Sequence, residues 1–283
     1  MENKTVVISG ANAGIGFATA KALLNKGAEV LMFCRNVEKA ETAKKELISI
    51  TGNNKIDIFQ VDFESFDSVE RACKACLAKY DKIDVLLNNA GATYSDFELT
   101  KDGIERTMQV NHFGYYLMSY YLLTLLKNAE SARIVNVASK AHYGVTIDFD
   151  TINKPDGYMV FKQYQYSKLA NVLFTKKLAK LLKSHNITVN CLHPGVVKTK
   201  IGNKSSNWFH SAMWSLFAFF GVNPDKGAET SIYLASSPEV ADITGKYFDK
   251  CKPYEGSDVA RDDKLIEQFW NWSGEIARKN WEI

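Results

Sequence analysis

The sequence predicts an α/β fold in which a single doubly wound parallel sheet of about seven strands carries helices on both faces. Short apolar runs alternate with helical stretches along most of the chain, and this alternation requires crossover connections between parallel strands. The strand candidates are continuous apolar runs, which is typical of strands covered on both faces. Neither an internal repeat nor a Pro- or Ser-rich linker divides the chain, so residues 1–283 are expected to form one domain.

The expected elements follow one another at short intervals. The β-branched run at 5–8 ends in a glycine-rich turn, and the helix that follows at 17–25 stops at Gly27. A second apolar run at 29–33 leads into a helix at 37–49. The remaining expected elements are strands at 55–61, 84–88, 133–138, 188–192 and 245–248 and helices at 65–80, 107–127 and 165–184.

The composition is that of an ordinary globular protein with little net charge. Hydrophobic residues make up 46% and charged residues 24% of the 283 positions, which is enough apolar material for a sizeable core without metal or disulfide support. The 35 basic and 32 acidic residues give a net charge of +3, and the basic clusters are short. Such clusters indicate solvated helix faces and argue against a nucleic-acid partner.

The cysteines and the apolar runs bear on the cellular compartment. Five cysteines without regular spacing argue against a disulfide framework and favour a reduced, intracellular protein. The pattern Cys73-x-x-Cys76 lies in a helical stretch and has no second pair, so no metal site is expected. No signal peptide is visible, and no run reaches about 18 apolar residues, which crossing a membrane would need. We therefore expect a cytoplasmic protein, with peripheral contact to an intracellular membrane as a further option.

A glycine-rich turn connects the first strand to the first helix. Its glycines are Gly10, Gly14 and Gly16, and they permit a tight turn and a close approach of the backbone to a bound group. The following helix points its free N–H groups and the positive end of its dipole at that position. Strand, turn and helix together predict a site for the pyrophosphate of a dinucleotide, with Asn12 and Ile15 in the same turn.

The spacing Gly-x-x-x-Gly-x-Gly in this turn resembles the short-chain dehydrogenase/reductase family, whose members have a Rossmann-type fold. The resemblance extends from about Lys4 to Phe248. Three stretches look like the retinol dehydrogenase branch of that family, namely Cys34-Arg35-Asn36, the run from Tyr166 to Phe174, and the run from Gly245 to Asp249. Many enzymes of that branch carry an N-terminal membrane anchor, and none is expected here.

The end of the second strand bears on the choice between the two nicotinamide dinucleotides. NAD enzymes place an acid there to bind the ribose 2′-hydroxyl, whereas a 2′-phosphate needs a cation and no nearby carboxylate. This chain has Arg35 and Asn36 at that point and no acid, and a guanidinium can donate two hydrogen bonds to a phosphate. We therefore expect NADP(H) as the cofactor, with an NAD(H)-preferring enzyme as the alternative.

Reduction of a carbonyl requires a proton donor as well as a hydride donor. A tyrosine can serve if a nearby ammonium lowers its pKa, which is about 10 in a free side chain. Tyr164 and Lys168 are four residues apart and share one helix face, whereas the residue four after Tyr166 is Ala170. Tyr164 is therefore the predicted acid and base, and Lys168 is predicted to lower its pKa and to bind the nicotinamide ribose.

The family resemblance implies further site residues at the ends of other strands. Ser139 would hold the substrate oxygen beside Tyr164, and Asn111 would bind a water that links Lys168 to solvent. Without the resemblance, Ser139 also fits a helix cap and Asn111 a core hydrogen bonder, and His193 is expected to be structural. The residues expected to bind the cofactor are Gly10, Asn12, Gly14, Ile15, Gly16, Arg35, Asn36, Asp62, Phe63, Asn89, Ala90, Gly91, Tyr164, Lys168, Pro194, Gly195, Val197 and Thr199.

The substrate side is expected to lie in variable loops. The segment 208–220 is dense in aromatic residues and lies within a stretch, about 200–225, where relatives keep a mobile lid. We interpret it as the wall of an apolar pocket, with a membrane-surface or partner-binding patch and a buried helix as alternatives. Tyr143 and the loop at 147–163 are expected to form the opposite wall.

These expectations describe an NADP(H)-dependent oxidoreductase that transfers a hydride between nicotinamide and a lipophilic carbonyl or alcohol, such as retinal or retinol. The alternative is a catalytically silent NADP(H)-binding regulatory or scaffold protein of the same fold, because a fold does not determine a function. A small lipophilic substrate is the expected partner. Family members are often dimers or tetramers, which makes a homodimer one expected assembly.

Overall fold

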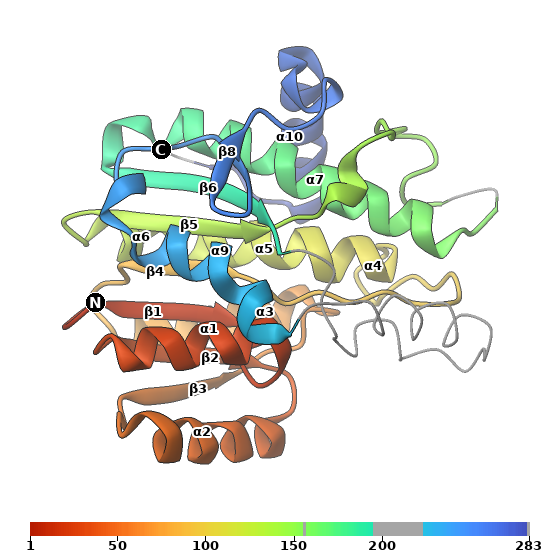
Figure 1. Ribbon diagram of the computed structural model, residues 1–283. Helices are drawn as coiled ribbons and strands as arrows, with labels where there is room; N and C mark the ends of the chain where they lie inside the picture. Colours follow the sequence, from red (N-terminus) through yellow and green to blue (C-terminus); the bar gives the residue numbers. More distant parts are fainter. Residues whose placement is uncertain (155–156, 195–222, 282–283) are drawn as a thin grey trace.

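An eight-stranded sheet runs through the computed structural model, which describes residues 1–154, 157–194 and 223–281 (Figure 1). The strand order is β3-β2-β1-β4-β5-β6-β7-β8, and all neighbours pair in parallel except the last two. The predicted α/β class is confirmed, with one strand more than expected. The strands are β1 (Thr5–Ser9), β2 (Glu29–Cys34), β3 (Ile56–Gln60), β4 (Val85–Asn88), β5 (Ala132–Val137), β6 (Ile187–His193), β7 (Tyr247–Asp249) and β8 (Lys252–Tyr254).

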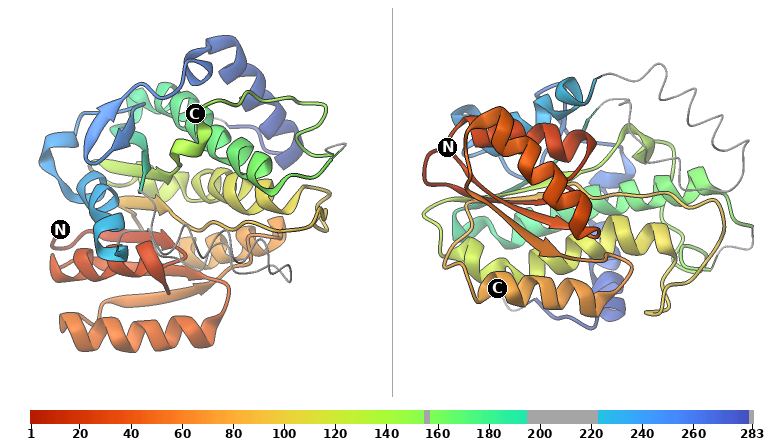
Figure 2. Two further views of the ribbon diagram at one scale, coloured as in Figure 1. Left: turned by 45° about the vertical axis from the view of Figure 1, so that its right-hand side comes forward. Right: turned by 90° about the horizontal axis from the view of Figure 1, so that it is seen from below.

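Helices pack against both faces of this sheet (Figures 1 and 2). In the described part of the chain, one face is covered by α1 (Gly14–Asn25), α2 (Val37–Thr51) and α9 (Pro224–Ser236). The other face is covered by α3 (Phe66–Leu77), α5 (Gly114–Tyr121), α6 (Leu123–Lys127) and α7 (Val160–Leu181). Helix α10 (Asp263–Ala277) packs on α7, at the opposite end of the molecule from β3 and α2 (Figure 1).

The alternation of side chains along the strands produces a separate core on each face. In β1, Val6 and Ile8 belong to the core beneath α1 and α9, whereas Val7 belongs to the core beneath α3 and α5. All three side chains are fully buried. Successive residues of a strand point to opposite faces, so a strand covered on both faces must be apolar throughout. This is why the strands could be recognised as continuous apolar runs.

The strand order reverses at β1, and this reversal creates a binding position. From β1 the chain first adds β2 and β3 on one side, and then crosses to add β4, β5 and β6 on the other. The connections that leave β1 and β4 therefore diverge at the carboxyl ends of these two strands. In open α/β sheets, ligands bind in the crevice at such a switch point. The glycine-rich turn after β1 lies at this place.

The eighth strand forms a hairpin with β7. Phe248 pairs with Pro253 in antiparallel register, and the two residues of the connecting turn, Lys250 and Cys251, have φ values of 50° and 61°. Two-residue hairpin turns with positive φ normally use Asn and Gly, because other side chains are strained there. The pair Lys250-Cys251 therefore does not indicate a hairpin turn, and Pro253 argues against a strand except at the edge of a sheet. These two features explain why β8 was not predicted.

The expected helix at 107–127 is present but interrupted. The structure divides it into α4 (Arg106–Met108), the π-helix η1 (Gln109–Phe113), α5 and α6. The carboxylate of Glu105 starts it by accepting the N–H groups of Thr107 and Met108, at 2.9 and 2.8 Å. A π-turn interrupts the regular pairing of a helix and often occurs at a functional site. Here it carries Asn111.

Most other expected elements begin and end within a few residues of the observed bounds, apart from α7, which starts at Val160 and so includes Tyr164. Helix α10 was not predicted, although Asp262 caps it and Leu265, Ile266 and Phe269 form a buried stripe.

No helix in the parts of the chain that the structure describes combines the length and the apolar character needed to span a bilayer.

Candidate active site

The turn after β1 allows close approach of a ligand. Gly10 and Gly14 have φ values of 70° and 56°, in the left-handed region that favours glycine. A Cβ on Gly16 would lie 2.3 Å from the carbonyl oxygen of Gly10 and 2.7 Å from Nδ2 of Asn89, so no larger residue fits without displacement. Helix α1 begins here, and its N-cap residue Ala13 offers no side-chain acceptor to the first N–H groups. These donors are available to an anion, so the turn fits the pyrophosphate of a dinucleotide.

The side chain of Ser9 ties this turn to the segment after β4. Its hydroxyl accepts the N–H groups of Asn89 and Ala90, at 2.8 and 2.9 Å, and Nδ2 of Asn89 donates to the carbonyl oxygen of Ser9 at 2.8 Å. The predicted residues Asn89 and Ala90 therefore lie at the switch point, and Asn89 holds the two strand ends together. Ser9 was not predicted, although a hydroxyl at the end of a buried strand was its available signal.

Two other predicted residues of the turn have contacts inside the protein. The N–H groups of Asn12 and Ala11 donate to the thiol of Cys34, whose pKa burial raises to about 11. Ile15 is buried and packs with Ala228 of α9. Asn12 and Ile15 thus fix the turn between β2 and α9, and a cofactor role for their side chains stays a prediction.

Lys168 is a buried ammonium group beside the segment after β4. Its side chain is 4% exposed, and its Nζ donates to the carbonyl oxygen of Val137 at 3.0 Å. A Cβ placed on Gly91 would lie 3.8 Å from this Nζ and 3.4 Å from Oδ1 of Asn111, so both side chains border Gly91. An ammonium has three donors, and a single carbonyl leaves two for the hydroxyl groups of a ribose. The predicted ribose-binding residue therefore fits this role.

Tyr164 and Ser139 lie together next to Lys168. Tyr164 stands one turn before Lys168 in α7, and the Nζ of Lys168 is 5.5 Å from the centre of the Tyr164 ring. The hydroxyl of Ser139, which follows β5, is hydrogen-bonded to Tyr164 and also accepts the N–H of Ala141 at 3.1 Å. Ser139 is thus both a helix cap and a partner of the predicted catalytic hydroxyl.

The pKa of Tyr164 differs from the sequence-based expectation. Burial raises it above the ordinary value of 10, and the hydrogen bond from Ser139 only partly opposes this effect. Burial also lowers the pKa of Lys168 to about 7. A lysine that is about half neutral at pH 7 is a weak source of positive charge, so the expected lowering by Lys168 is not seen. The two groups are close enough for the protonation of each to depend on the other.

Asn111 lies in the π-helix, and both its amide oxygen and its amide nitrogen are hydrogen-bonded. Its Oδ1 accepts the N–H of Ala92 at 2.8 Å, and its Nδ2 donates to the carbonyl oxygen of Ala92 and to Oγ of Ser167, both at 3.0 Å. The amide therefore connects the segment after β4 to α7 next to Lys168. This is the core hydrogen bonding that the sequence left open for Asn111, and its link to a water stays a prediction.

The end of β2 carries Arg35 as predicted, but an acid lies beside it. Nη1 of Arg35 is 3.0 Å from Oε1 of Glu64, and Asn36 caps α2 by accepting the N–H of Lys39 at 2.7 Å. The expectation of no nearby carboxylate is therefore wrong. Glu64 follows β3, which pairs in parallel with β2, so the segments after the two strands meet at the same edge. This contact joins residues 29 positions apart, so the residues directly after β2 give no sign of it.

Asp62 and Phe63 occupy the start of this second segment. Oδ1 of Asp62 accepts the N–H of Glu64 at 3.1 Å, which fixes the turn after β3. The ring of Phe63 lies so close to Gly114 that an added Cβ there would be 2.7 Å from the ring. The predicted contact of Asp62 and Phe63 with adenine is not tested by these packing contacts.

The last group of predicted residues is only partly described. Pro194 follows β6 in the described part of the chain, and Nδ1 of the neighbouring His193 accepts the N–H of Lys140 at 3.4 Å. Burial lowers the pKa of His193 to about 4, in agreement with the structural role expected for it. The predicted residues Gly195, Val197 and Thr199, the segment 208–220 and residues 200–222 of the expected lid lie outside the described residues.

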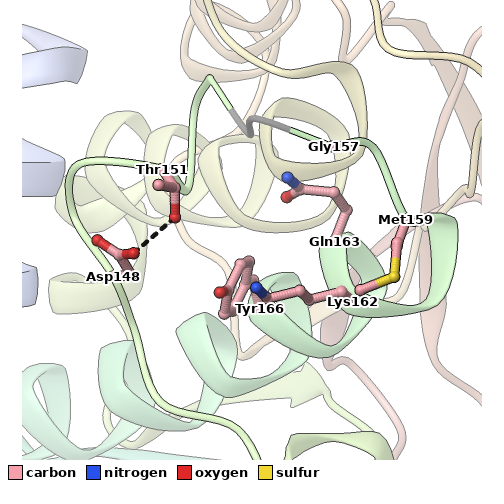
Figure 3. Close-up of a pocket in the computed structure, with 7 residues that line it drawn as sticks. All are labelled: Asp148, Thr151, Gly157, Met159, Lys162, Gln163 and Tyr166. Carbon is pink, nitrogen blue, oxygen red and sulfur yellow. Dashed lines mark hydrogen bonds between the residues drawn. The ribbon is translucent and has the colours of Figure 1, made fainter.

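A small cavity lies beside the start of α7 (Figure 3). Because a helix turns by about 100° per residue, Gln163 and Tyr166 project from the face opposite to Tyr164 and Lys168. The loop residues Asp148 and Thr151 border this cavity, and the expected role of the loop at 147–163 as a substrate wall stays a prediction. The residues that line the cavity are Asp148, Thr151, Gly157, Met159, Lys162, Gln163 and Tyr166.

Comparisons with known proteins agree with this geometry. The family model described as short chain dehydrogenase matches residues 4–209. Human retinol dehydrogenase 14 is 39% identical over 96% of this chain and 86% of its own length, and human retinol dehydrogenase 12 is 38% identical over 100% and 89%.

Solved structures give the same result. An uncharacterized protein from Mycobacterium paratuberculosis has a TM-score of 0.80 and 26% identity, covering 100% of this chain and 96% of that chain. A 3-ketoacyl-(acyl-carrier-protein) reductase from Brucella melitensis, complexed with NADH, has a TM-score of 0.68 and 26% identity over 88% and 97%. A short chain dehydrogenase from Escherichia coli CFT073, complexed with NADPH, shares the fold at a TM-score of 0.67 and 22% identity over 88% and 97%. The chain therefore belongs to the short-chain dehydrogenase family of nicotinamide-dependent oxidoreductases, as the spacing of its glycine turn predicted.

Proposed function

We propose that the protein is an NADP(H)-dependent oxidoreductase that transfers a hydride between nicotinamide and the carbonyl or alcohol carbon of a lipophilic substrate. One observation carries the proposal: the Tyr164 hydroxyl is bonded to Ser139, and the Nζ of Lys168 lies near both the Tyr164 ring and Gly91. A regulatory protein that only binds the dinucleotide would not need a partly buried tyrosine whose hydroxyl is bonded to a serine. This cluster favours the enzyme over the silent binding protein.

The proposed cofactor contacts follow the switch point. The N–H groups at the start of α1 would bind the pyrophosphate, and the free donors of Lys168 would bind the ribose next to nicotinamide. Arg35, which is about half exposed at the end of β2, would bind the 2′-phosphate. The bound dinucleotide supplies or receives the hydride, and the protein supplies the orientation and the proton.

In the reduction direction, the proposed proton donor is the hydroxyl of Tyr164. The raised pKa of this partly buried phenol keeps it protonated at neutral pH, so it can donate a proton to the substrate oxygen as negative charge develops there. Ser139 would donate a hydrogen bond to the same oxygen. When Tyr164 gives up its proton, the phenolate favours the charged form of Lys168, and the ammonium in turn stabilises the phenolate. Oxidation of an alcohol uses the same groups in reverse.

Two observations support a lipophilic substrate. The relatives with 38–39% identity are named as retinol dehydrogenases, and retinol is a lipophilic alcohol. The segment 208–220 of this chain is rich in aromatic residues, as the wall of an apolar pocket would be. We therefore propose long-chain or isoprenoid aldehydes and ketones in preference to small, water-soluble ones.

A substrate screen tests the proposal. Purified protein with NADPH or NADH would be incubated with a panel of aldehydes and ketones of increasing apolar length, including retinal, while the absorbance of reduced nicotinamide is followed. We expect turnover with NADPH and a kcat/KM that increases with apolar length. Binding of NADPH without reduction of any compound would favour the silent binding protein, and a preference for short polar carbonyls would overturn the substrate class.

Replacing Arg35 by alanine is expected to weaken NADPH binding about tenfold to a hundredfold and to change NADH binding little. A charge-assisted hydrogen bond is worth about 1.5–3 kcal/mol, and about 1.4 kcal/mol corresponds to a factor of ten. NADH lacks the 2′-phosphate and so loses no such contact. The dissociation constants of both cofactors would be measured by titration of the protein fluorescence. Equal weakening of the two would remove the 2′-phosphate argument.

A further inference from the structure

Four side chains form a charged cluster next to the expected position of the 2′-phosphate. Glu64 lies at its centre, between Arg35 at the end of β2, Tyr94 in the segment after β4, and Arg106 at the start of α4. Among them, Arg35 is the most exposed, with 53% of its side chain accessible, against 25% for Arg106 and 20% for Glu64. A ligand would therefore meet Arg35 first.

All acceptor positions of the Glu64 carboxylate are engaged. Oε1 accepts the Tyr94 hydroxyl at 2.7 Å and Nη1 of Arg35 at 3.0 Å. Oε2 is bonded by Nε and Nη2 of Arg106, at 3.1 and 3.0 Å. A carboxylate has about four lone-pair sites, so this one has no site left for a ribose hydroxyl. The acid next to Arg35 is thus prevented from acting as the acid of an NAD-type site.

Arg106 is held more firmly than Arg35. Its guanidinium lies 4.0 Å from the centre of the Tyr94 ring and is also paired with Glu98. Arg35 makes one bond to Glu64 and has no second ion pair within the described residues. Arg106 thus makes two contacts with Glu64 against one from Arg35, and Arg35 keeps other N–H donors for a phosphate.

Glu64 is ionised at neutral pH, so its charge must be offset. Burial acts to raise its pKa, but the hydroxyl of Tyr94 and the guanidinium of Arg106 lower it overall. The same interactions with Glu64 raise the pKa of Arg106 against the effect of burial. An ionised carboxylate 3.0 Å from Arg35 would compete with a 2′-phosphate for that guanidinium if no second cation were present.

We infer that Arg106 is a positioning residue for cofactor specificity: by binding and neutralising Glu64, it leaves Arg35 available to the 2′-phosphate and favours NADPH over NADH. The inference rests on the proposed NADP(H) function. Without Arg106, Oε2 of Glu64 would be free to accept a ribose 2′-hydroxyl, and its charge would repel the 2′-phosphate. The same acid would then favour NADH.

The test compares cofactor binding by the full chain in Arg106→Gln, Glu64→Gln and the double variant. Arg106→Gln is expected to weaken NADPH binding about tenfold, the size expected for one uncompensated charge at a partly exposed site, while NADH binding stays equal or becomes tighter. The double variant is expected to return to within about threefold of the native ratio of the two dissociation constants, because the repelling charge is gone. The readout is titration of the protein fluorescence with each dinucleotide.

Other outcomes separate the explanations. If Arg106→Gln weakens both cofactors equally and the double variant does not recover, Arg106 has only a structural role and the inference is wrong. Should Arg106→Gln fail to fold, Glu64→Gln alone decides, since it must bind NADPH at least as tightly as the native chain. If Arg35→Ala also fails to discriminate between the cofactors, the proposed NADP(H) preference itself is at fault. Arg106→Lys, which keeps the charge, is expected to retain most of the preference for NADPH.

Discussion

Replacing Tyr164 by phenylalanine is expected to lower kcat by about a thousandfold or more, while the dissociation constant of the dinucleotide changes by less than about twofold. A positioned acid or base contributes about 10²–10⁴ to the rate, and Tyr164 is the one tyrosine of α7 that is bonded to Ser139. Phenylalanine keeps the ring and its packing, so the fold is preserved. Ser139 also keeps its bond from the N–H of Ala141. Steady-state kinetics and a binding titration measure the two quantities separately.

Tyr166 offers a matched control for this experiment. It is a buried tyrosine two residues further along the same helix, and it borders the cavity on the opposite face. Tyr166→Phe removes the same atom from the same helix and is expected to leave kcat within about threefold of the native value. Full activity of Tyr164→Phe, or an equal loss in both variants, would contradict the role given to Tyr164. If the native chain itself lacks turnover, the silent binding protein becomes the better description.

The parts of the fold that depend on local pattern could be predicted from the sequence. Strands covered on both faces must be apolar along their whole length, and the glycines of the first turn are required by backbone geometry. Strand β8 could not be predicted, because its hairpin turn uses Lys250 and Cys251 in a backbone conformation that normally selects asparagine and glycine. The π-turn that carries Asn111 likewise has no signal of its own in the apolar pattern of the sequence.

The candidate site was predictable where residues share one helix and unpredictable where distant segments meet. The spacing of Tyr164 and Lys168 defines their common face, whereas the contact between Arg35 and Glu64 arises only because β2 and β3 are neighbours. The pKa of Tyr164 shows the same limit. The four-residue spacing predicts that Lys168 lies near Tyr164. The burial that raises the pKa of Tyr164, however, depends on the whole fold.

Replacing Lys168 by methionine is expected to stabilise the protein and to abolish efficient turnover. Burial of a charged lysine that makes one hydrogen bond costs a large desolvation free energy. In Lys168 this effect lowers the pKa from 10.5 to about 7. Each pKa unit corresponds to about 1.4 kcal/mol, so the charged form is disfavoured by about 5 kcal/mol in the folded chain. Losing the bond to Val137 costs about 1–3 kcal/mol, which leaves a net gain of about 2 kcal/mol or more in the free energy of unfolding.

This stabilisation should depend on pH in a defined direction. Below about pH 7, Lys168 is protonated in both the folded and the unfolded chain, and the folded chain bears the full desolvation cost. Between about 7 and 10.5 the unfolded chain binds more protons at this site than the folded chain, so the native protein gains stability as the pH rises. The advantage of Lys168→Met is therefore largest at pH 6 to 7 and decreases towards pH 10. Urea unfolding of both proteins at several pH values, without dinucleotide, measures it.

Lys176 provides the control, because it is a largely buried lysine two turns further along the same helix but has an acidic partner. Its Nζ lies 3.7 Å from Glu255, and its side chain is 12% exposed. Lys176→Met is expected to leave turnover intact and to give no comparable stabilisation, since the ion pair already offsets part of the cost of burial. A Lys168→Met protein that is less stable than the native chain at pH 6 would mean that Lys168 is not the desolvated ammonium described here. The proposed binding of a ribose by its free donors would then lose its physical basis.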